Sequence, residues 1–308
     1  MKNPSNKYIE DIIRQKIHKD DKLVEVVMDV LSLGKEAAYR RLRGEVPYTF
    51  DDIMKISSKY TISLDEIVGN KMPGTALANT NIIDIENPIA SYKEYLLSQT
   101  EIFREINKRK NGKAYSYKNL NKFRLYRWIH QMNSSANLPA FKDVEFPEDM
   151  WRIHQETIQE FLKIPEINFV FDKSLFLNQV KDILLFVQLD LIDKESLSQL
   201  KSELLQLLDD IEQMTAISPE SEVKRSLFVS NVSFETSYLF FEAEGYQTCG
   251  LRLLGISVIT TQDTWVCQQQ KRWIESLKRY STLISISGEI DRYTFINQQK
   301  EYISQLDL

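Results

Sequence analysis

Apolar positions at the start of the chain follow helical spacing and predict short amphipathic helices. An opening helix is expected over residues 6–18, and a second apolar stripe covers residues 23–31. A break at residues 32–34 separates that stripe from a third stretch, KEAAYRRLRG, which Gly44 closes at its C-terminal end. The chain is therefore expected to begin with three short helices joined by tight turns.

The pattern continues with two capped helices. Thr49 is a suitable N-cap for TFDDIMKISSKY, with Asp52 three residues later, and Ser63 is placed to cap SLDEIVG. Residues 1–70 therefore predict a five-helix domain. Residues 71–90 are poor in apolar periodicity and rich in Asn, Pro and Gly, which is typical of a linker.

Residues 91–308 are expected to form one larger domain that is helical to about residue 218. Helices are expected near residues 88–110, 119–133, 147–163, 173–190 and 193–217. The last of these carries a leucine-rich stripe made of Leu197, Leu200, Leu204, Leu207, Ile211 and Met214. The stripe either packs in the core or forms a dimer contact, and Leu205 and Leu208 widen it in favour of the core.

The character of the sequence changes after Pro219. Residues 226–261 are rich in Val, Ile, Phe, Tyr and Thr and predict three or four antiparallel strands, with a hairpin turn at Glu244-Gly245. Two helices follow, one capped by Asp263 and one over residues 289–306. The expected fold is mainly α with a small antiparallel β element, an α+β chain of two domains.

The helix–break–helix over residues 23–44 has the spacing of a helix-turn-helix. In that motif the first helix braces the second, which buries one side and lays the other in the major groove of DNA. Ala38 and Leu42, four residues apart, are placed to face inwards. The opposite positions form a polar and mostly cationic stripe of Lys35, Glu36, Tyr39, Arg40 and Arg43.

These residue types suit contacts with duplex DNA. Arg binds guanine bidentately in the major groove, whereas Lys and Tyr suit phosphates or base edges. The groove-reading residues are expected to be Lys35, Glu36, Tyr39 and Arg40. Arg43 and Thr49 are expected to contact the DNA backbone, helped by free amides at the start of the helix after Thr49. An ordinary helical hairpin with a solvated basic face is the alternative interpretation.

The full string LVEVVMDVLSLGKEAAYRRLRGEVPYTFDDIMKISSKYTISLDEIVG is more specific than the break alone. It resembles the DNA-binding domain of phage Cro and repressor proteins, the XRE-type regulators, in a variant similar to the BetR domain. The resemblance implies a five-helix fold that binds specific duplex DNA, commonly as a dimer. Two positions depart from the family pattern, because Ser32 stands where Gly is frequent and Gly34 where Ser or Thr is frequent. Ser32 would then adopt a left-handed backbone, and Gly34 remains an acceptable cap.

Much of residues 85–305 also resembles the long C-terminal region of bacterial regulators that begin with this DNA-binding domain. The likeness lies in AYSYKNLNKFRLYRWIHQMNSSANLPAFKDVEFPED, in the leucine-rich helix and in the segment from TTQDTWVCQQQ onwards. The resemblance implies a regulator with a DNA-binding part and a long C-terminal part, and it does not indicate a ligand.

Charge is distributed unevenly along the chain. The composition, 43% hydrophobic and 27% charged residues with a net charge of −5, is that of a globular protein. Residues 35–43 carry +3, residues 104–127 carry +8 and residues 128–308 carry −11. A basic region on an acidic protein favours an anionic partner, although a solvated charged face is nearly as common.

Aromatic residues alternate with the basic residues of this second region. Tyr115, Tyr117, Phe123, Tyr126 and Trp128 lie among Lys118, Lys122, Arg124 and Arg127. Such interleaving occurs in grooves that bind single-stranded nucleic acid, but core aromatics flanked by snorkelling cations are commoner.

The sequence offers little chemistry of other kinds. His18, His130 and His154 are scattered without metal-ligand spacing, and no phosphate-binding glycine loop occurs, so we expect no enzyme, no metal and no cofactor. Cys249 and Cys267 are interpreted as small core residues, with a redox-sensing pair left open. No stretch approaches the about 18 apolar residues of a membrane helix, so a cytoplasmic protein without membrane contact is expected.

The sequence thus predicts a DNA-binding transcription regulator. Its partners would be double-stranded DNA, a second copy of the chain in a homodimer and an unidentified small-molecule effector. The alternatives are a protein–protein adaptor that has lost DNA binding and a ligand-binding sensor.

Overall fold

The computed structural model describes residues 4–17, 21–60, 76–116, 121–133, 139–215, 223–233, 237–285 and 288–307. They belong to two compact units, Met1–Leu77 and Ala78–Leu308, which divide within the segment expected to be a linker.

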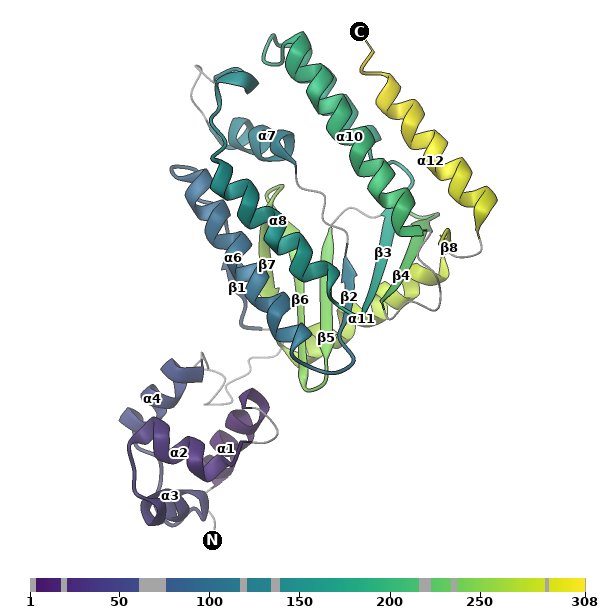
Figure 1. The fold of residues 1–308 in the computed structure, drawn as a ribbon. Helices are drawn as coiled ribbons and strands as arrows, with labels where there is room; N and C mark the ends of the chain where they lie inside the picture. The colour runs from purple at the N-terminus through teal and green to yellow at the C-terminus, as the bar shows by residue number, and fades with distance from the viewer. Residues whose placement is uncertain are drawn as a thin grey trace. The chain divides into compact units, whose positions relative to one another are not determined.

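The first unit is a small helical domain. Its helices are α1 Pro4–Lys16, α2 Leu23–Leu31, α3 Lys35–Leu42 and α4 Phe50–Tyr60 (Figure 1). The apolar stripes of the four helices meet in a core made of Ile9, Ile12, Ile13, Leu23, Val27, Leu31, Ala38, Tyr48 and Ile56. Four of the five expected helices are present, and the fifth, SLDEIVG, lies outside the described residues.

The second unit is built on an eight-stranded sheet among the described residues. The strands are β1 Asn79–Asn81, β2 Lys113–Ser116, β3 Glu166–Asp172, β4 Lys224–Ser230, β5 Tyr238–Ala243, β6 Tyr246–Leu253, β7 Ser257–Thr261 and β8 Ser281–Leu283. Their order is β1-β7-β6-β5-β2-β3-β4-β8. The strands β2, β3 and β4 are parallel to one another, and every other pairing is antiparallel.

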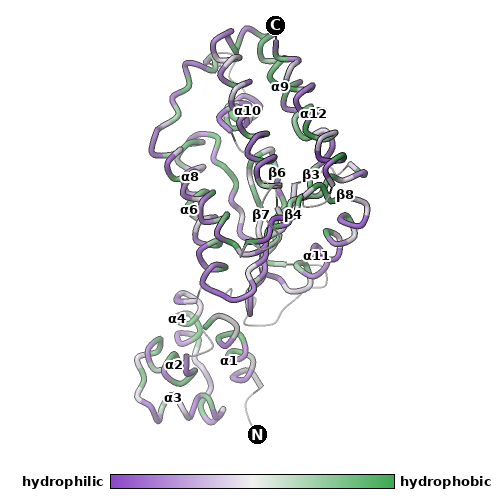
Figure 2. The backbone as a smooth tube through the Cα atoms, turned by 45° about the vertical axis from the view of Figure 1, so that its right-hand side comes forward, coloured by the Kyte–Doolittle hydropathy of each residue, from purple (hydrophilic) through white to green (hydrophobic). Residues whose placement is uncertain are grey.

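Helices cover both faces of this sheet. They are α6 Pro88–Asn107, α7 Lys122–Met132, α8 Glu148–Leu162, α9 Leu177–Gln188, α10 Lys194–Thr215, α11 Thr264–Arg279 and α12 Glu289–Ser304, with a 3-10 helix at Phe141–Asp143. Six of them, α6, α7, α8, α9, α10 and α12, contribute to the core on one face, where α6 packs against α8 and α10 against α12. Among the described helices, only α11 packs on the other face (Figure 1). Figure 2 shows the alternation of hydrophilic and hydrophobic segments along these helices, as expected for elements with one buried side.

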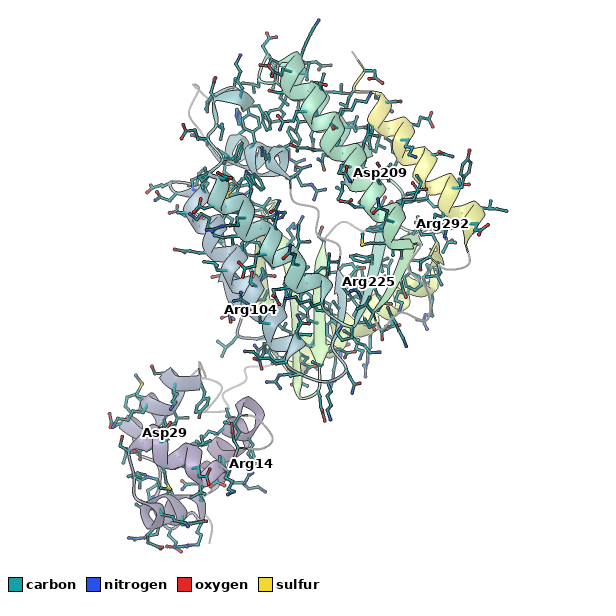
Figure 3. All side chains as sticks on the ribbon, viewed as in Figure 1. Arg14, Asp29, Arg104, Asp209, Arg225 and Arg292 are labelled. Atoms are coloured by element: carbon teal, nitrogen blue, oxygen red, sulfur yellow. The ribbon has the colours of Figure 1, made fainter. Side chains whose placement is uncertain are left out.

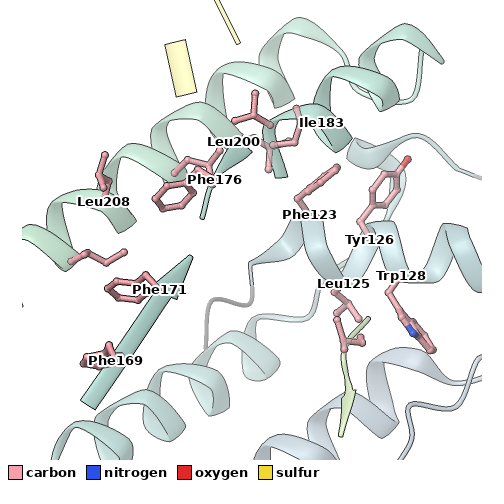
Figure 4. Close-up of a cluster of buried hydrophobic side chains, with 14 of the residues drawn as sticks. Phe123, Leu125, Tyr126, Trp128, Phe169, Phe171, Phe176, Ile183, Leu200 and Leu208 are labelled. Carbon is pink, nitrogen blue, oxygen red and sulfur yellow. The ribbon is translucent and has the colours of Figure 1, made fainter. Parts of the chain in front are cut away.

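The alternation of side chains along the strands divides the core into two parts. In β3, Phe169 and Phe171 point to the larger cluster, whereas Val170 points to the α11 side. Five consecutive residues of β3 are buried, as is usual for a parallel strand that is covered on both faces. Figure 4 shows the larger cluster, where Phe169 and Phe171 share a core with Phe123, Leu200 and side chains of neighbouring helices.

The fold class is α+β as expected, but the prediction of a small antiparallel element is wrong. The sheet is large and mixed, and β4 pairs in parallel with β3. Residues 91–218 are not purely helical, because β2 and β3 lie between the helices. Residues 79–81, expected in a linker, form the edge strand β1. The hairpin turn at Glu244-Gly245 is confirmed, with Gly245 at a φ of 71° that suits glycine.

The leucine-rich stripe of α10 lies in the core. Leu200, Leu204, Leu208 and Ile211 are almost fully buried within a single chain. The interpretation as a core helix is therefore confirmed.

Candidate nucleic-acid interface

The turn between α2 and α3 has the backbone that a helix-turn-helix requires. Ser32 ends α2 with φ 52° and ψ 44°, the left-handed conformation expected for this position. Its amide donates to the Met28 carbonyl, which closes the helix. Gly34 begins α3 as an extended N-cap with φ −69°. The turn therefore sets the second helix across the first within three residues.

The helix α3 buries one side and exposes the other. Ala38 is completely buried against the domain core, and Leu42 packs beside it. The outer face of α3 consists of the exposed residues Lys35, Glu36, Tyr39, Arg40 and Arg43. The assignment of inward and outward positions from the sequence agrees with this burial.

The second arginine of the helix, Arg41, belongs to the interior. Its guanidinium contacts Asp52 Oδ2 of α4 with an N–O distance of 3.1 Å, and the two side chains are only 14% and 10% exposed. The helical spacing signals this, because Arg41 lies three residues after the buried Ala38. The Asn6 side-chain amide of α1 donates to the carbonyl of Arg41, near the end of the same helix, and to the carbonyl of Val46 in the segment that follows.

The start of α4 is closed by a reciprocal capping box. The Thr49 amide donates to Asp52 Oδ2 at 2.9 Å, and the Asp52 amide donates to Thr49 Oγ1 at 3.1 Å. Burial raises the pKa of Asp52, but the hydrogen bonds from Thr49 and Arg41 outweigh it and hold the pKa below its usual value. Thr49 is exposed, and its hydroxyl also hydrogen-bonds to the Asp52 carboxylate, so a phosphate oxygen would have to compete with Asp52 for that hydrogen.

Acidic residues lie directly beside the arginines of the outer face. Arg43 Nε contacts Glu45 at 2.6 Å and Arg43 Nη2 contacts Glu36 at 2.9 Å. Glu45 also lies 3.6 Å from Arg40. Hydrogen bonds to Glu45 and Glu36 raise the pKa of Arg43, and the same bond from Arg43 lowers the pKa of Glu45.

These ion pairs reduce the charge that the interface presents to DNA. The value of +3 counted over residues 35–43 includes Arg41, which is committed to Asp52. Adding Glu45 to the outer face leaves three cations and two carboxylates, a net charge of +1. A phosphate or a guanine could bind Arg43 only by displacing the carboxylate of Glu36 or Glu45. Lys35 and Tyr39 have no carboxylate partner among the described residues.

The second basic region, residues 104–127, has most of its described cations paired. Arg104 contacts Glu101 and Glu156 on the surface of α6 and α8, where Figure 3 labels it. Arg109 binds Glu105, Lys113 binds Glu166 and Arg127 binds Asp182. Four acids outside the region, Glu101, Glu156, Glu166 and Asp182, thus offset about half of the charge of +8.

The aromatics interleaved with this region are core residues. Tyr115, Phe123, Tyr126 and Trp128 are each at most 5% exposed, whereas Tyr117 and Lys118 lie outside the described residues. The core interpretation is therefore confirmed for these four residues.

Histidines and cysteines form no recognisable catalytic or metal centre in the described ranges. His130 is buried with a ring nitrogen 3.2 Å from the Pro139 carbonyl, and its burial lowers its pKa. His154 packs on Trp151, and His18 lies outside the described residues.

Cys249 and Cys267 are buried free thiols that share a hydrogen bond, which lowers the pKa of Cys249. No cluster of potential metal ligands occurs among the described residues.

Within the ranges described, none of the helices combines the length and the apolar character needed to cross a membrane.

Comparison with known proteins leaves the family open. No protein-family model matches the chain, and no curated protein matches it. Among solved structures there is a similarity to TrmBL2, an archaeal chromatin protein described as showing a novel mode of DNA binding. The alignment has 10% sequence identity, covers 91% of this chain and 99% of that chain, and has a TM-score of 0.27. That score is too low to establish a shared fold, so the function is argued from the residues of this chain.

Proposed function

We propose that this chain is a sequence-specific DNA-binding transcription regulator that places α3 in the major groove. The observation that supports the proposal is the outer face of α3, where five long polar side chains stand over a buried Ala38 behind a tight left-handed turn. In this proposal Lys35, Glu36, Tyr39 and Arg40 read bases, and Arg43 and Thr49 bind phosphates. The similarity of the sequence to XRE-type and BetR-like domains points the same way.

The test is a gel-shift assay with DNA from upstream of the chain's own gene. Arg40→Ala combined with Arg43→Ala should abolish the shifted band, because it removes a base contact worth about 1–3 kcal/mol together with a phosphate contact. Arg14→Ala is the matched control, since it removes one exposed arginine from α1 and leaves α3 intact. Equal shifts by the wild type and the double variant would contradict the assignment of α3.

The competing function is a protein–protein adaptor, and one observation favours it. The outer face of α3 carries only +1 because Glu36 and Glu45 occupy Arg43. The dependence of binding to random duplex DNA on salt separates the two functions. A DNA-binding protein should lose affinity steeply, with a log–log slope of about −0.9 for each phosphate contacted, whereas an adaptor should give a flat line.

Three further parts of the proposal concern the whole chain. We place the protein in the cytoplasm and assign it a binding role in preference to an enzymatic one. A homodimer would supply the second half-site contact, because one helix-turn-helix reads only a half-site. Light scattering after size-exclusion chromatography should then give about twice the chain mass of 36.1 kDa.

A further inference from the structure

The second unit contains a cavity of about 620 Å³ with mixed polar and apolar walls, which include the Arg127–Asp182 pair described above. Its walls come from the carboxyl end of β3, the start of α9, the helix α7 and the turn between β6 and β7. In open sheets with parallel strands, ligands bind beyond the carboxyl ends of those strands. The position of the cavity is therefore one where a ligand is expected.

Gln179 lines the cavity and has a hydrogen-bond donor that is unused among the described residues. Its side chain is 4% exposed, and its Oε1 accepts from Arg124 Nε at 3.2 Å. That bond fixes the orientation of the amide, because the reversed amide would set two donors against each other. Its Nε2 group is consequently left buried without an acceptor among the described residues.

Trp128 contributes a second donor in the same situation. The indole is 1% exposed, and its Nε1 has no acceptor within the described part of the chain. Gly255, at a φ of 80°, lets the β6–β7 turn approach the indole so closely that an added Cβ would lie 3.2 Å from Trp128 Cδ1. A buried N–H without an acceptor destabilises a protein, so two such groups at one cavity favour a bound acceptor.

The charges of the cavity also favour an acceptor. Arg124, Arg127 and Arg252 line it together with two carboxylates, Asp172 and Asp182. Asp182 already binds Arg127, and Asp172 accepts from the amide and the hydroxyl of Ser174. Arg252 has no ion-pair partner among the described residues.

We propose that this cavity binds a small acidic molecule, whose carboxylate or phosphate oxygens accept from Gln179 and Trp128 and face the Arg252 guanidinium. The donor set suits an oxyanion, since arginine and amide N–H groups donate and the two acids are occupied. A metal ion is a poor match for the same reason. The inference goes beyond DNA binding and does not depend on it, because every residue involved belongs to the second unit.

The experiment measures binding of inorganic phosphate and of citrate to the full chain by calorimetry and thermal shift, against sodium chloride of equal ionic strength. Gln179→Glu keeps an acceptor for Arg124 but replaces the donor with a negative charge, and Arg252→Gln removes the cation. Arg272→Gln is the matched control, because Arg272 is exposed on α11 at the opposite face of the sheet.

Stabilisation by phosphate or citrate beyond that of sodium chloride is expected for the wild type and for Arg272→Gln. Binding should weaken about tenfold or more in Gln179→Glu and Arg252→Gln, as for loss of one hydrogen bond to a charged group. A response to citrate alone identifies a carboxylate ligand, and a response to phosphate alone identifies a phosphorylated one. The same binding in Gln179→Glu as in the wild type would overturn the proposal.

A second measurement covers the case in which a variant does not fold. The chain has four tryptophans, so ¹⁵N-indole labelling gives four signals, and Trp128→Phe identifies the one from the cavity. Phosphate or citrate should move that signal in the wild type. If neither anion moves it and neither stabilises the protein, the cavity is not an oxyanion site.

Discussion

Asp52 is the residue on which the position of α3 against α4 should depend most. The change that tests this is Asp52→Asn, which keeps the shape of the side chain and removes its charge. The oxygen Oδ2 of Asp52 accepts the Thr49 amide and contacts the Arg41 guanidinium at 3.1 Å, in a place where both side chains are largely buried. Asparagine can retain only part of this set, so Arg41 would keep a buried charge without a full partner.

The expected loss follows from these contacts. A hydrogen bond to a charged group contributes about 1.5–3 kcal/mol, and one N–H bond survives in the variant, so we expect the free energy of unfolding of the first unit to fall by about 2–3 kcal/mol. Asp51→Asn is the matched control. Asp51 lies in the same helical turn, but its side chain is 75% exposed, and its ion pair with Lys55 is a solvent-screened surface contact.

The assay must report on the first unit alone. All four tryptophans belong to residues 78–308, so their fluorescence follows the second unit and serves as an internal reference. Hydrogen exchange of peptides from residues 35–60 in increasing urea follows the first unit.

The dependence on pH gives a second check. Because the folded pKa of Asp52 is lowered, the difference between wild type and Asp52→Asn should be complete near pH 7. It should be lost as the pH falls below about 4, through the folded pKa. A loss in Asp52→Asn within about 0.5 kcal/mol of that in Asp51→Asn would refute the reasoning.

Three further outcomes are expected. Glu45→Gln should tighten binding to duplex DNA and steepen its salt dependence in fluorescence anisotropy, because it removes a carboxylate that contacts both Arg43 and Arg40. Unchanged affinity would argue against DNA contacts by these two arginines. Ser32→Gly should raise the free energy of unfolding of the first unit by about 0.5 kcal/mol, because glycine adopts the left-handed backbone without strain. Gly34→Ser should also stabilise the first unit in the same exchange assay, because Gly34 has an ordinary φ and open space around it. Cys249 and Cys267 should resist a bulky thiol reagent in the native protein and react with two equivalents after denaturation, and rapid native labelling would contradict their burial.

The first unit was the more predictable part from sequence, because its information is local. Helical spacing, the break at Ser32 and the cap at Thr49 each depend on residues a few positions apart, and the observed helices follow them. The outer face of α3 could be assigned in the same way. The ion pair between Arg43 and Glu45 could not be predicted from the sequence. The two residues are two positions apart just after the end of a helix, and that spacing does not determine whether their side chains come into contact.

The sheet of the second unit was harder to predict because its pairings are distant in sequence. The strand β3, EINFVFD, lies between two helices, and its burial on both faces removes the alternation that identifies a strand. The polar strand β1 has no apolar pattern and is recognisable only by its pairing with β7. The oxyanion cavity has no sequence signal, since Gln179, Trp128 and Arg252 meet only in the folded chain.

The pairing of β1 with β7 has a practical meaning for dividing the protein. Thr80 pairs with Ile259, and the Ile83 amide donates to the Ser257 hydroxyl. The segment that follows the first unit therefore forms an edge strand of the sheet. Cutting the chain at residue 90 would strip that edge and leave β7 with open backbone groups that invite aggregation. Cutting at Leu77, where the two compact units divide, would leave the sheet of the described residues whole, so we expect the separated second unit to keep β1 paired with β7.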